Sequence, residues 1–345
     1  MDVAIKVIYN VALLFVMMVP GFLMKKCRLC DERFGKGLSN LVLYIAQPAL
    51  TLLAYLRPYD ENIMVNALYV FGFSVVLHGI FAGVAMLFFK KAPDSKRRML
   101  RFATIFSNAA FMGIPLIAVV LEPEYPGATL YATIYNITFN LFLWSLGAWI
   151  CTNGRDENTN GVDDSQDIKK ASILTALTHP TTIASVIGLA FLLLQNPIPQ
   201  LKIMIPEVLA DQELTVANAL PKILVEALTM LKGLVAPLSM AVIGLRLADM
   251  SFKGMLRDVE MYIFIVLRHI ALPLISVGIV KLVGLIVPLN PAVEMVTVIL
   301  AAAPAASSAT MFAEKFDCDA VYVSRLVTVS TVISIVTIPL ILLLV

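Results

Sequence analysis

The chain has 345 residues, of which 59% are hydrophobic and 14% are charged, and its mean hydropathy is +0.87. An average soluble domain carries about 25% charged residues, so a soluble fold of this composition would lack the polar groups to cover its surface. The net charge of +2 gives no case for binding nucleic acid. The composition therefore indicates an integral membrane protein surrounded by a lipid bilayer.

Ten stretches are apolar and long enough to cross a bilayer as helices, which takes roughly 20 residues each. In chain order they cover residues 3–24, 38–56, 63–89, 101–121, 128–151, 179–195, 222–247, 259–285, 292–313 and 319–344. The alternating segments of a β-barrel are absent from the sequence. The first stretch has no basic start and no small-residue cleavage pattern, so we do not expect a cleaved signal peptide. The predicted fold class is all-α, with ten transmembrane helices.

The basic residues predict the orientation of these spans, because Lys and Arg are hard to translocate. The odd-numbered loops and their flanks hold 18 Lys and Arg residues, whereas the even-numbered loops hold only 3. We therefore predict a multi-pass protein of the plasma (cytoplasmic) membrane, with both the N- and C-termini outside. The four cysteines, Cys27, Cys30, Cys151 and Cys318, fall near the cytoplasmic face in this topology and are expected to be reduced thiols. Half a zinc site at Cys27 and Cys30 is the less favoured reading, because no second ligand pair accompanies them.

The sequence also predicts an internal repeat. A polar linker at residues 152–170 divides ten spans into five and five, so the predicted halves are residues 1–151 and 171–345. Pro48 and Pro115 are 67 residues apart, as are Pro237 and Pro304, and a shift of 189 maps the first pair onto the second. Because five is an odd number, the halves enter the membrane from opposite sides, which is typical of inverted-repeat transporters.

Two of these prolines are predicted to break their helices near the middle of the bilayer. Asn108 and Gly113 precede Pro115, and three hydroxyl residues follow Pro304, namely Ser307, Ser308 and Thr310. A break presents free N–H groups at one half-helix end, which suit a carboxylate, and free carbonyls at the other, which suit a cation. The alternative interpretation is that proline is simply common in membrane helices.

Further polar side chains inside the spans are candidate substrate ligands. Asn136 and Asn140 are four residues apart and share a helix face, where they either line the site or bond between helices. The other candidates are Asn10, Gln47 and Lys232. Arg268 is expected to reach the interface with its long side chain or to form a structural pair.

Four segments resemble the auxin efflux carrier family. They are Asn108-x-x-Phe111-x-Gly113-x-Pro115-Leu116, the run from Ala303-Pro304 to Phe312-Ala313-Glu314-Lys315-Phe316, Pro237-Leu238 with Gly244-x-Arg246-Leu247, and Thr331 with Ser334 and Pro339. The resemblance implies two inverted repeats, akin to bile-acid:sodium symporters, with crossing broken helices in the fourth and ninth spans. It also implies a scaffold of the first, second, sixth and seventh spans, a mobile transport domain of the other six, and a homodimer. The linker of about twenty residues is similar to short bacterial members and unlike plant members with long loops, so auxin itself is not the expected substrate.

The expected function is therefore transport, most simply efflux, of a small organic anion with a carboxylate, without enzymatic chemistry. No metal or organic cofactor is expected, and coupling to a sodium ion or a proton stays open. The alternatives are a sodium- or proton-coupled symporter of the same fold, a passive channel and a membrane-embedded enzyme. The three histidines form no H-E-x-x-H motif and no P-loop is present, which disfavours an enzyme and an ATP-driven pump.

Overall fold

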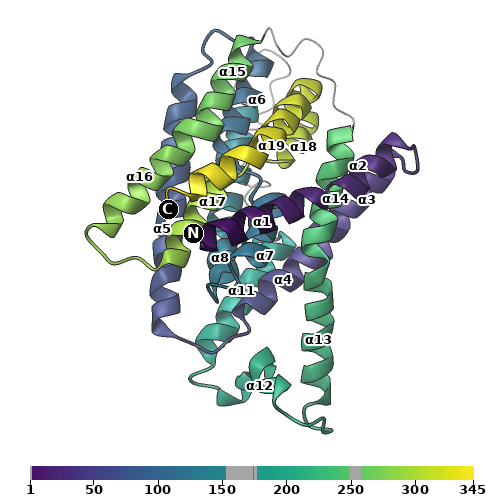
Figure 1. Ribbon diagram of the computed structural model, residues 1–345, viewed down its shortest axis with the longest axis vertical. Helices are drawn as coiled ribbons and strands as arrows, with labels where there is room; N and C mark the ends of the chain where they lie inside the picture. Colours follow the sequence, from purple (N-terminus) through teal and green to yellow (C-terminus); the bar gives the residue numbers. More distant parts are fainter. Residues whose placement is uncertain (1, 153–173, 175–176, 249–257) are drawn as a thin grey trace.

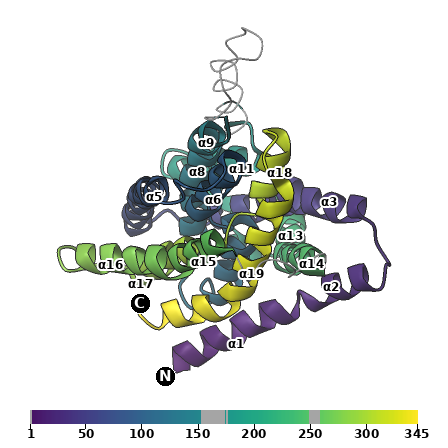
Figure 2. The same cartoon turned by 90° about the horizontal axis from the view of Figure 1, so that it is seen from above.

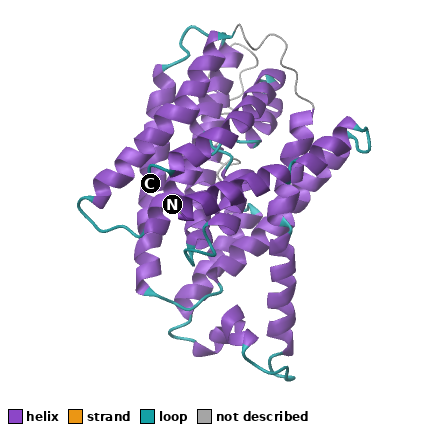
Figure 3. Cartoon of the chain, viewed as in Figure 1, coloured by secondary structure: helices purple, strands orange, loops and turns teal. Residues whose placement is uncertain are grey.

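The computed structural model describes residues 2–152, 174, 177–248 and 258–345. These residues are helical or lie in loops, and none of them forms a strand (Figure 3). The two ends of the chain lie side by side in both views (Figures 1 and 2). The prediction of an all-helical fold is thereby confirmed.

The helices of the first half are α1 (Asp2–Val16), α2 (Val19–Lys26), α3 (Glu32–Leu41), η1 (Val42–Ala46), α4 (Gln47–Tyr55), α5 (Glu61–Leu87), α6 (Asp94–Ile105), η2 (Ala109–Gly113), α7 (Ile114–Val120), α8 (Ala128–Phe142), η3 (Leu143–Gly147) and α9 (Ala148–Thr152). Those of the second half are α11 (Pro180–Leu194), η4 (Pro199–Met204), α12 (Pro206–Ala210), α13 (Ala219–Gly233), α14 (Val235–Ala248), α15 (Val259–Val266), η6 (Leu267–Ala271), α16 (Leu272–Gly284), α17 (Pro291–Ala302), α18 (Ser308–Lys315) and α19 (Ala320–Leu342).

Seven helical stretches of the described chain are long and apolar enough to cross a membrane. They are Tyr9–Lys26, Arg33–Tyr55, Glu61–Leu87, Ala128–Thr152, Ala219–Ala248, Val259–Gly284 and Ala320–Leu342. Three shorter apolar helices, Ala109–Val120, Pro180–Leu194 and Pro291–Ala302, lie in the other three predicted stretches. Two of these three are short because the polypeptide leaves the helical path in the middle of the stretch.

Three prolines follow a widened helical turn. Pro48, Pro115 and Pro273 each lie two residues after a π-helical segment, η1, η2 and η6 respectively. Proline lacks an N–H and its ring clashes with the carbonyl one turn back. The wider turn accommodates that clash, so the chain continues as a helix through all three positions.

One set of helices, which we call the first helix group, comprises α1 to α4, α11, α13 and α14. Within it α2 crosses α14 (Figure 2), and α4 packs against α11 and α13. The crossing of α2 and α14 depends on two glycines, because a Cβ at Gly21 would lie 2.1 Å from the Ala241 carbonyl oxygen. A Cβ at Gly244 would lie 2.0 Å from that of Met18. Backbone therefore touches backbone at this crossing.

The second helix group comprises α5, α6, α8, α9 and α15 to α19. Here α17 is surrounded by α5, α8, α16 and α19, while α6 packs against α5, α15, α18 and α19 (Figure 1). Helix α17 is buried along nearly its whole length, from Ala292 to Ala302. The segment η2–α7 lies between the two groups, since it contacts α1 and α14 on one side and α8 and α17 on the other.

Candidate functional site: two paired helix breaks

Two helices stop in the interior of the second group, and the two breaks pair with each other. Helix α6 ends at Ile105 and α17 ends at Ala302. Ser107 and Ala305 then form an antiparallel β-bridge. The Asn108 N–H donates to the carbonyl oxygen of Pro304 at 2.6 Å, and the Ala306 N–H donates to that of Phe106 at 2.8 Å. We call this junction of residues 106–108 and 303–307 the crossover.

The two prolines do not occupy equivalent places in the crossover, and the prediction that both break their helices is wrong for one of them. Pro304 lies within its break, whereas Pro115 is the second residue of α7, seven residues after Asn108. Ser107 and Ala305 are 198 residues apart, but the two prolines are 189 apart. The first break follows the change of direction at Phe106, while the widened turn η2 absorbs the effect of Pro115.

Arg268 closes the carbonyl ends of both broken helices. Its side chain is 0% exposed, so the expectation that it would reach the membrane interface is wrong, and it forms a structural pair with backbone. Its guanidinium donates to Thr104 O at 3.1 Å, near the end of α6, and to Ala301 O at 2.9 Å and Ala303 O at 3.1 Å, at the end of α17. A positive charge at a helix C-terminus opposes the helix dipole and satisfies its free carbonyls. The cation that such ends attract is thus a side chain of the protein itself.

A series of hydrogen bonds holds one backbone amide of the crossover in place. The Ala305 N–H donates to Ser330 Oγ at 2.8 Å, and Ser330 Oγ lies 2.8 Å from His269 Nε2. The other ring nitrogen of His269 lies 3.1 Å from Thr337 Oγ1. Because Ser330 accepts from Ala305, its hydroxyl proton is available to His269. This amide is therefore already occupied and is not a ligand-binding group.

Four other backbone N–H groups at the crossover remain free. Within the described part of the chain, no acceptor is recorded for the N–H groups of Ala110 and Phe111 at the start of η2. The same holds for Ser307 and Ser308 at the start of α18. These are the positive ends of two helical segments, and they are separate from the carbonyl ends that Arg268 occupies.

Asn108 and Gln47, both predicted as site residues, both adjoin η2. Asn108 is 3% exposed and Gln47 is 2% exposed. Gln47 Nε2 donates to the carbonyl oxygen of Ala110, which links the first helix group to the crossover. Asn108 Nδ2 and Gln47 Oε1 are buried and have no hydrogen-bond partner within the described chain. A buried amide without a partner is costly, so these atoms are ready to bind a polar ligand.

Arg246 reaches the other free helix start. It lies in the last turn of α14, and its Nη1 donates to Ser307 O at 3.1 Å. Thr310 Oγ1 donates to the same carbonyl at 3.0 Å. The first helix group thus contacts the crossover with Gln47 at one free turn and Arg246 at the other, and Arg246 adds a positive charge beside the free N–H groups.

The remaining predicted residues are Gly113, Asn136, Asn140, Asn10 and Lys232. Gly113 packs against α17, since a Cβ there would lie 2.5 Å from Leu300 Cδ2. Asn136 and Asn140 are both buried in α8, and Asn136 Oδ1 has no partner among the described residues. Asn10 is half-buried in α1, which packs on α7. Lys232 is half-buried in the last turn of α13, a helix that contacts α4, α14, η1 and η4, and the structure does not bring it to the crossover.

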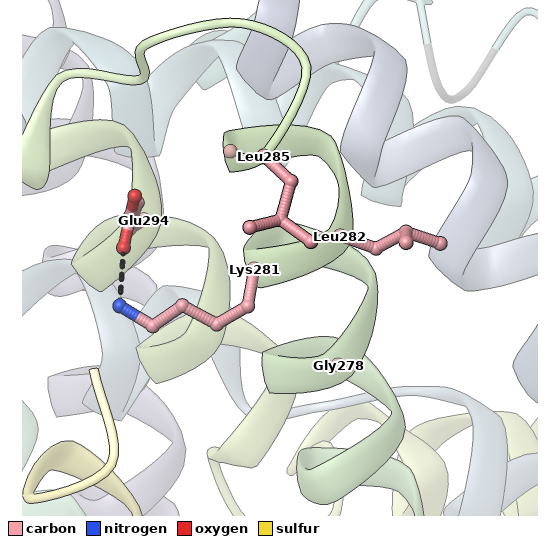
Figure 4. Close-up of a pocket in the computed structure, with 6 residues that line it drawn as sticks. Gly278, Lys281, Leu282, Leu285 and Glu294 are labelled. Carbon is pink, nitrogen blue, oxygen red and sulfur yellow. Dashed lines mark hydrogen bonds and ion pairs between the residues drawn. The ribbon is translucent and has the colours of Figure 1, made fainter.

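A large hollow lies elsewhere, at the end of α17 farthest from the crossover (Figure 4). It has a volume of about 470 Å³, and Lys281, Leu282, Leu285 and Glu294 are among its lining residues. Lys281 Nζ lies 2.8 Å from Glu294 Oε2 and donates to Val345 O at 2.9 Å. The charge of Lys281 is therefore already neutralised by Glu294, so the lining residues of this hollow offer no free cation to an anion.

Sequence reasoning missed Arg246 as a site residue and misplaced Arg268. Arg246 entered the sequence analysis among the basic residues that predict orientation and within a segment that resembles the family, but not as a site residue. It lies two residues after Gly244, at the close crossing of α2 and α14. For Arg268 the available signal was its depth within an apolar stretch. A buried arginine needs several acceptors, and helix breaks supply free carbonyls.

Comparison with known proteins assigns the chain to a family. The family model described as "Membrane transport protein", which is that of the auxin efflux carriers, matches residues 6–342. No curated protein sequence matches the chain. The matched region contains both helix breaks, Arg246 and Arg268, and covers nearly all of the sequence. The chain is therefore a multi-pass membrane protein that belongs to the auxin efflux carrier family of membrane transport proteins.

Proposed function

We propose that the protein carries a small organic anion across the membrane and that the carboxylate of this anion binds at the crossover. The most direct support is that the C-terminal carbonyls and the N-terminal N–H groups of the broken helices differ in whether they already have a partner. Arg268 occupies the carbonyl ends, whereas the N–H groups of Ala110, Phe111, Ser307 and Ser308 have no acceptor among the residues that the structure describes. The unpartnered Asn108 Nδ2 adds a fifth donor. Together these five donors suit an anion.

In this proposal the protein has ten spans in two inverted repeats, residues 1–151 and 171–345, with the linker at 152–170. The first helix group is the scaffold, and the second group with η2–α7 is the transport domain. Gln47 and Arg246 are the contacts that change when the transport domain moves against the scaffold, because each joins the two across their interface. Such movement exposes the site to each side of the membrane in turn.

The membrane potential is the proposed driving force. The termini lie outside and the cytoplasm is negative, so each negative charge that leaves the cell releases about 2.3 kcal/mol per 100 mV. Arg268 supports this over sodium coupling, since it already fills the place that a cation would take at the carbonyl ends. Efflux by this route needs no coupling ion.

The test is a thermal-shift screen of the purified protein against small carboxylates, with and without sodium and across pH. We expect a saturable rise in the melting temperature with at least one acid, without a requirement for sodium. In Asn108→Ala the acid concentration that gives half of the maximal rise should be at least tenfold higher than in the wild type. Asn62→Ala, at an exposed amide, should behave as wild type.

Flux into proteoliposomes then separates the remaining alternatives. A carrier gives slow, saturable uptake that follows an imposed potential. Single-channel currents in planar bilayers would instead identify a channel, and uptake that stops without sodium would identify a symporter. Unchanged binding in Asn108→Ala would remove Asn108 from the site.

A further inference from the structure

The hollow at the end of α16 combines an ion pair with an exposed apolar helix face, and the proposed function does not use it. Its volume of about 470 Å³ lies within the range of about 300–1,000 Å³ that is usual for ligand sites. The residues that line it come from the end of α16 and the first turn of α17 (Figure 4), namely Gly278, Lys281, Leu282, Gly284, Leu285 and Glu294. None of them is aromatic.

The ion pair lies where a span ends. Lys281 is three residues from the end of α16, which completes the apolar stretch Val259–Gly284 that is long enough to cross a membrane. Glu294 lies in the first turn of α17, just after the loop that follows α16. Long charged side chains at the end of a span reach the polar headgroups of the bilayer. We therefore place the hollow at the level of the headgroups.

The face of α16 that leads to the ion pair is apolar and has a gap in it. Leu274, Leu282 and Leu285 are 45%, 62% and 84% exposed. With Gly278 they follow one another at intervals of four, four and three residues, so they share one face of the helix. A Cβ at Gly278 would meet nothing within 4 Å. This face is therefore turned to the lipid, and the gap at Gly278 leaves room for an acyl chain.

The ion pair still offers one donor and one acceptor. Lys281 Nζ donates to Glu294 Oε2 at 2.8 Å and to Val345 O at 2.9 Å, and an ammonium group carries three N–H donors. Among the described residues, none donates to the second carboxylate oxygen, Glu294 Oε1. The side chains of Lys281 and Glu294 are 46% and 16% exposed, so a ligand can reach both.

The charges of the pair select the kind of headgroup. Lys281 and Glu294 together are neutral, so an anionic headgroup meets repulsion as well as attraction. A zwitterionic headgroup places its phosphate at Lys281 and its cation at Glu294. A primary ammonium donates a charge-assisted hydrogen bond to a carboxylate, whereas the quaternary ammonium of choline has no N–H and is typically bound by aromatic rings.

We propose that this hollow binds a phospholipid with a phosphoethanolamine headgroup. Its phosphate accepts from Lys281 Nζ, its ammonium donates to Glu294 Oε1, and one acyl chain lies over Gly278. The proposal is independent of the crossover, because the hollow lies at the opposite end of α17. A bound lipid of this kind joins the end of α16 to the start of α17.

The experiment is a lipid titration of the full chain in detergent, followed by native mass spectrometry, which counts the bound lipids and the copies of the chain. The probes are phosphatidylethanolamine, phosphatidylcholine and phosphatidylglycerol with identical acyl chains. We expect the first phosphatidylethanolamine to bind about tenfold more tightly than either of the others, since each of them loses a hydrogen bond between charged groups.

Two variants and a control locate the lipid. Glu294→Gln leaves Lys281 without its counter-charge, so the preference should change from phosphatidylethanolamine to phosphatidylglycerol; a merely structural role of Glu294 would weaken all three lipids alike. Gly278→Leu keeps both charges but fills the gap, and should weaken the binding of phosphatidylethanolamine. Gly72→Leu is the matched control, because a Cβ at this exposed glycine of α5 also meets nothing within 4 Å.

Three outcomes would overturn the proposal. They are equal binding of the three lipids, a preference of the wild type for phosphatidylglycerol, and equal lipid binding in Gly278→Leu and Gly72→Leu. A dimer that Gly278→Leu dissociates, without any lipid preference, would show that a second copy of the chain covers this face instead. None of these outcomes bears on the transport of an organic anion, which is tested at Asn108.

Discussion

The Nη2 atom of Arg268 lies 2.9 Å from the carbonyl oxygen of Ala301, so a side chain of η6 closes the C-terminal end of α17. The same guanidinium reaches Thr104 at the end of α6. One buried charge therefore holds together the two helices whose breaks form the crossover. It also leaves only the N–H ends of the crossover for a ligand.

The first prediction concerns this arginine. Arg268→Met leaves three buried carbonyls without this donor, and an unsatisfied buried acceptor costs about 1–3 kcal/mol. We expect a large fall in the melting temperature of the purified variant. Arg33→Met, at an exposed position, is the control and should melt as wild type. Equal melting of Arg268→Met and wild type would show that these hydrogen bonds do not stabilise the fold.

The second prediction concerns the contact between Arg246 and Ser307. Arg246→Met removes a charge-assisted hydrogen bond worth about 1.5–3 kcal/mol, so conformations in which the two helix groups are apart become about 10- to 100-fold more populated. In a background without the native cysteines, the thiol of Met112→Cys should therefore react faster with a maleimide when Arg246 is replaced by Met than when it is present. Leu29→Cys, which is already exposed, should react equally fast with and without Arg246. No acceleration at position 112 would mean that Arg246 does not hold the site closed.

The third prediction concerns the crossing of α2 and α14. In Gly244→Ala the added Cβ would meet the Met18 carbonyl at 2.0 Å, and neither backbone can move without separating the helices. Overpacking of this kind costs about 1–3 kcal/mol or more. Gly72→Ala is the matched control, because a Cβ there meets nothing within 4 Å and alanine favours a helix. We expect a lower melting temperature for the first variant and an equal or higher one for the second. Similar melting of the two variants would refute the close crossing.

The fourth prediction concerns pH and an ion cluster at the start of α15. Lys96 Nζ lies 2.9 Å from Asp258 Oδ1 and 3.3 Å from Glu260 Oε2, which joins α6 to the start of α15. Burial opposes the charge on both Lys96 and Asp258, but their hydrogen bond and attraction outweigh it. The pKa of Lys96 is therefore raised, with help from Glu260, and the pKa of Asp258 is lowered.

A lowered carboxyl pKa stabilises the fold above its unfolded pKa of about 3.9, and this stabilisation is lost as the pH falls through the folded pKa. The raised pKa of Lys96 stabilises the fold at every pH below about 10.4, so it does not limit the acid side. We expect Asp258→Asn to lower the free energy of unfolding by about 1 kcal/mol at neutral pH, and by progressively less as the pH falls from about 3.9 through the lowered folded pKa. A difference that keeps its neutral-pH size in strong acid would contradict the assignment to Asp258.

The sequence was most informative about helices and least informative about where they break. Hydrophobic stretches of about 20 residues predicted helical segments, and the described chain has a helix in each of them. The breaks were harder, because Pro48, Pro115 and Pro273 lie in helices that continue through a widened turn. A proline removes one hydrogen bond, but the path of the chain depends on whether neighbouring helices offer partners for the freed groups.

Asn108 and Gln47 were identified as site residues because polar side chains are rare in apolar spans, and in the structure Gln47 donates to Ala110 O, two residues after Asn108. Lys232 was selected by the same rule but lies on a helix away from the crossover. The rule does not separate them, because a one-dimensional pattern records depth in the membrane and not which helices are neighbours.

The sequence by itself determined the protein class, the helical segments and the family, because these depend on composition, on the length of apolar stretches and on local motifs. Only the tertiary structure decided that Ser107 pairs with Ala305, that Arg268 closes both carbonyl ends, and that Arg246 faces Ser307. These contacts join residues 33 to 198 positions apart in the chain. The free groups at each helix end therefore find their partners only when the helices pack.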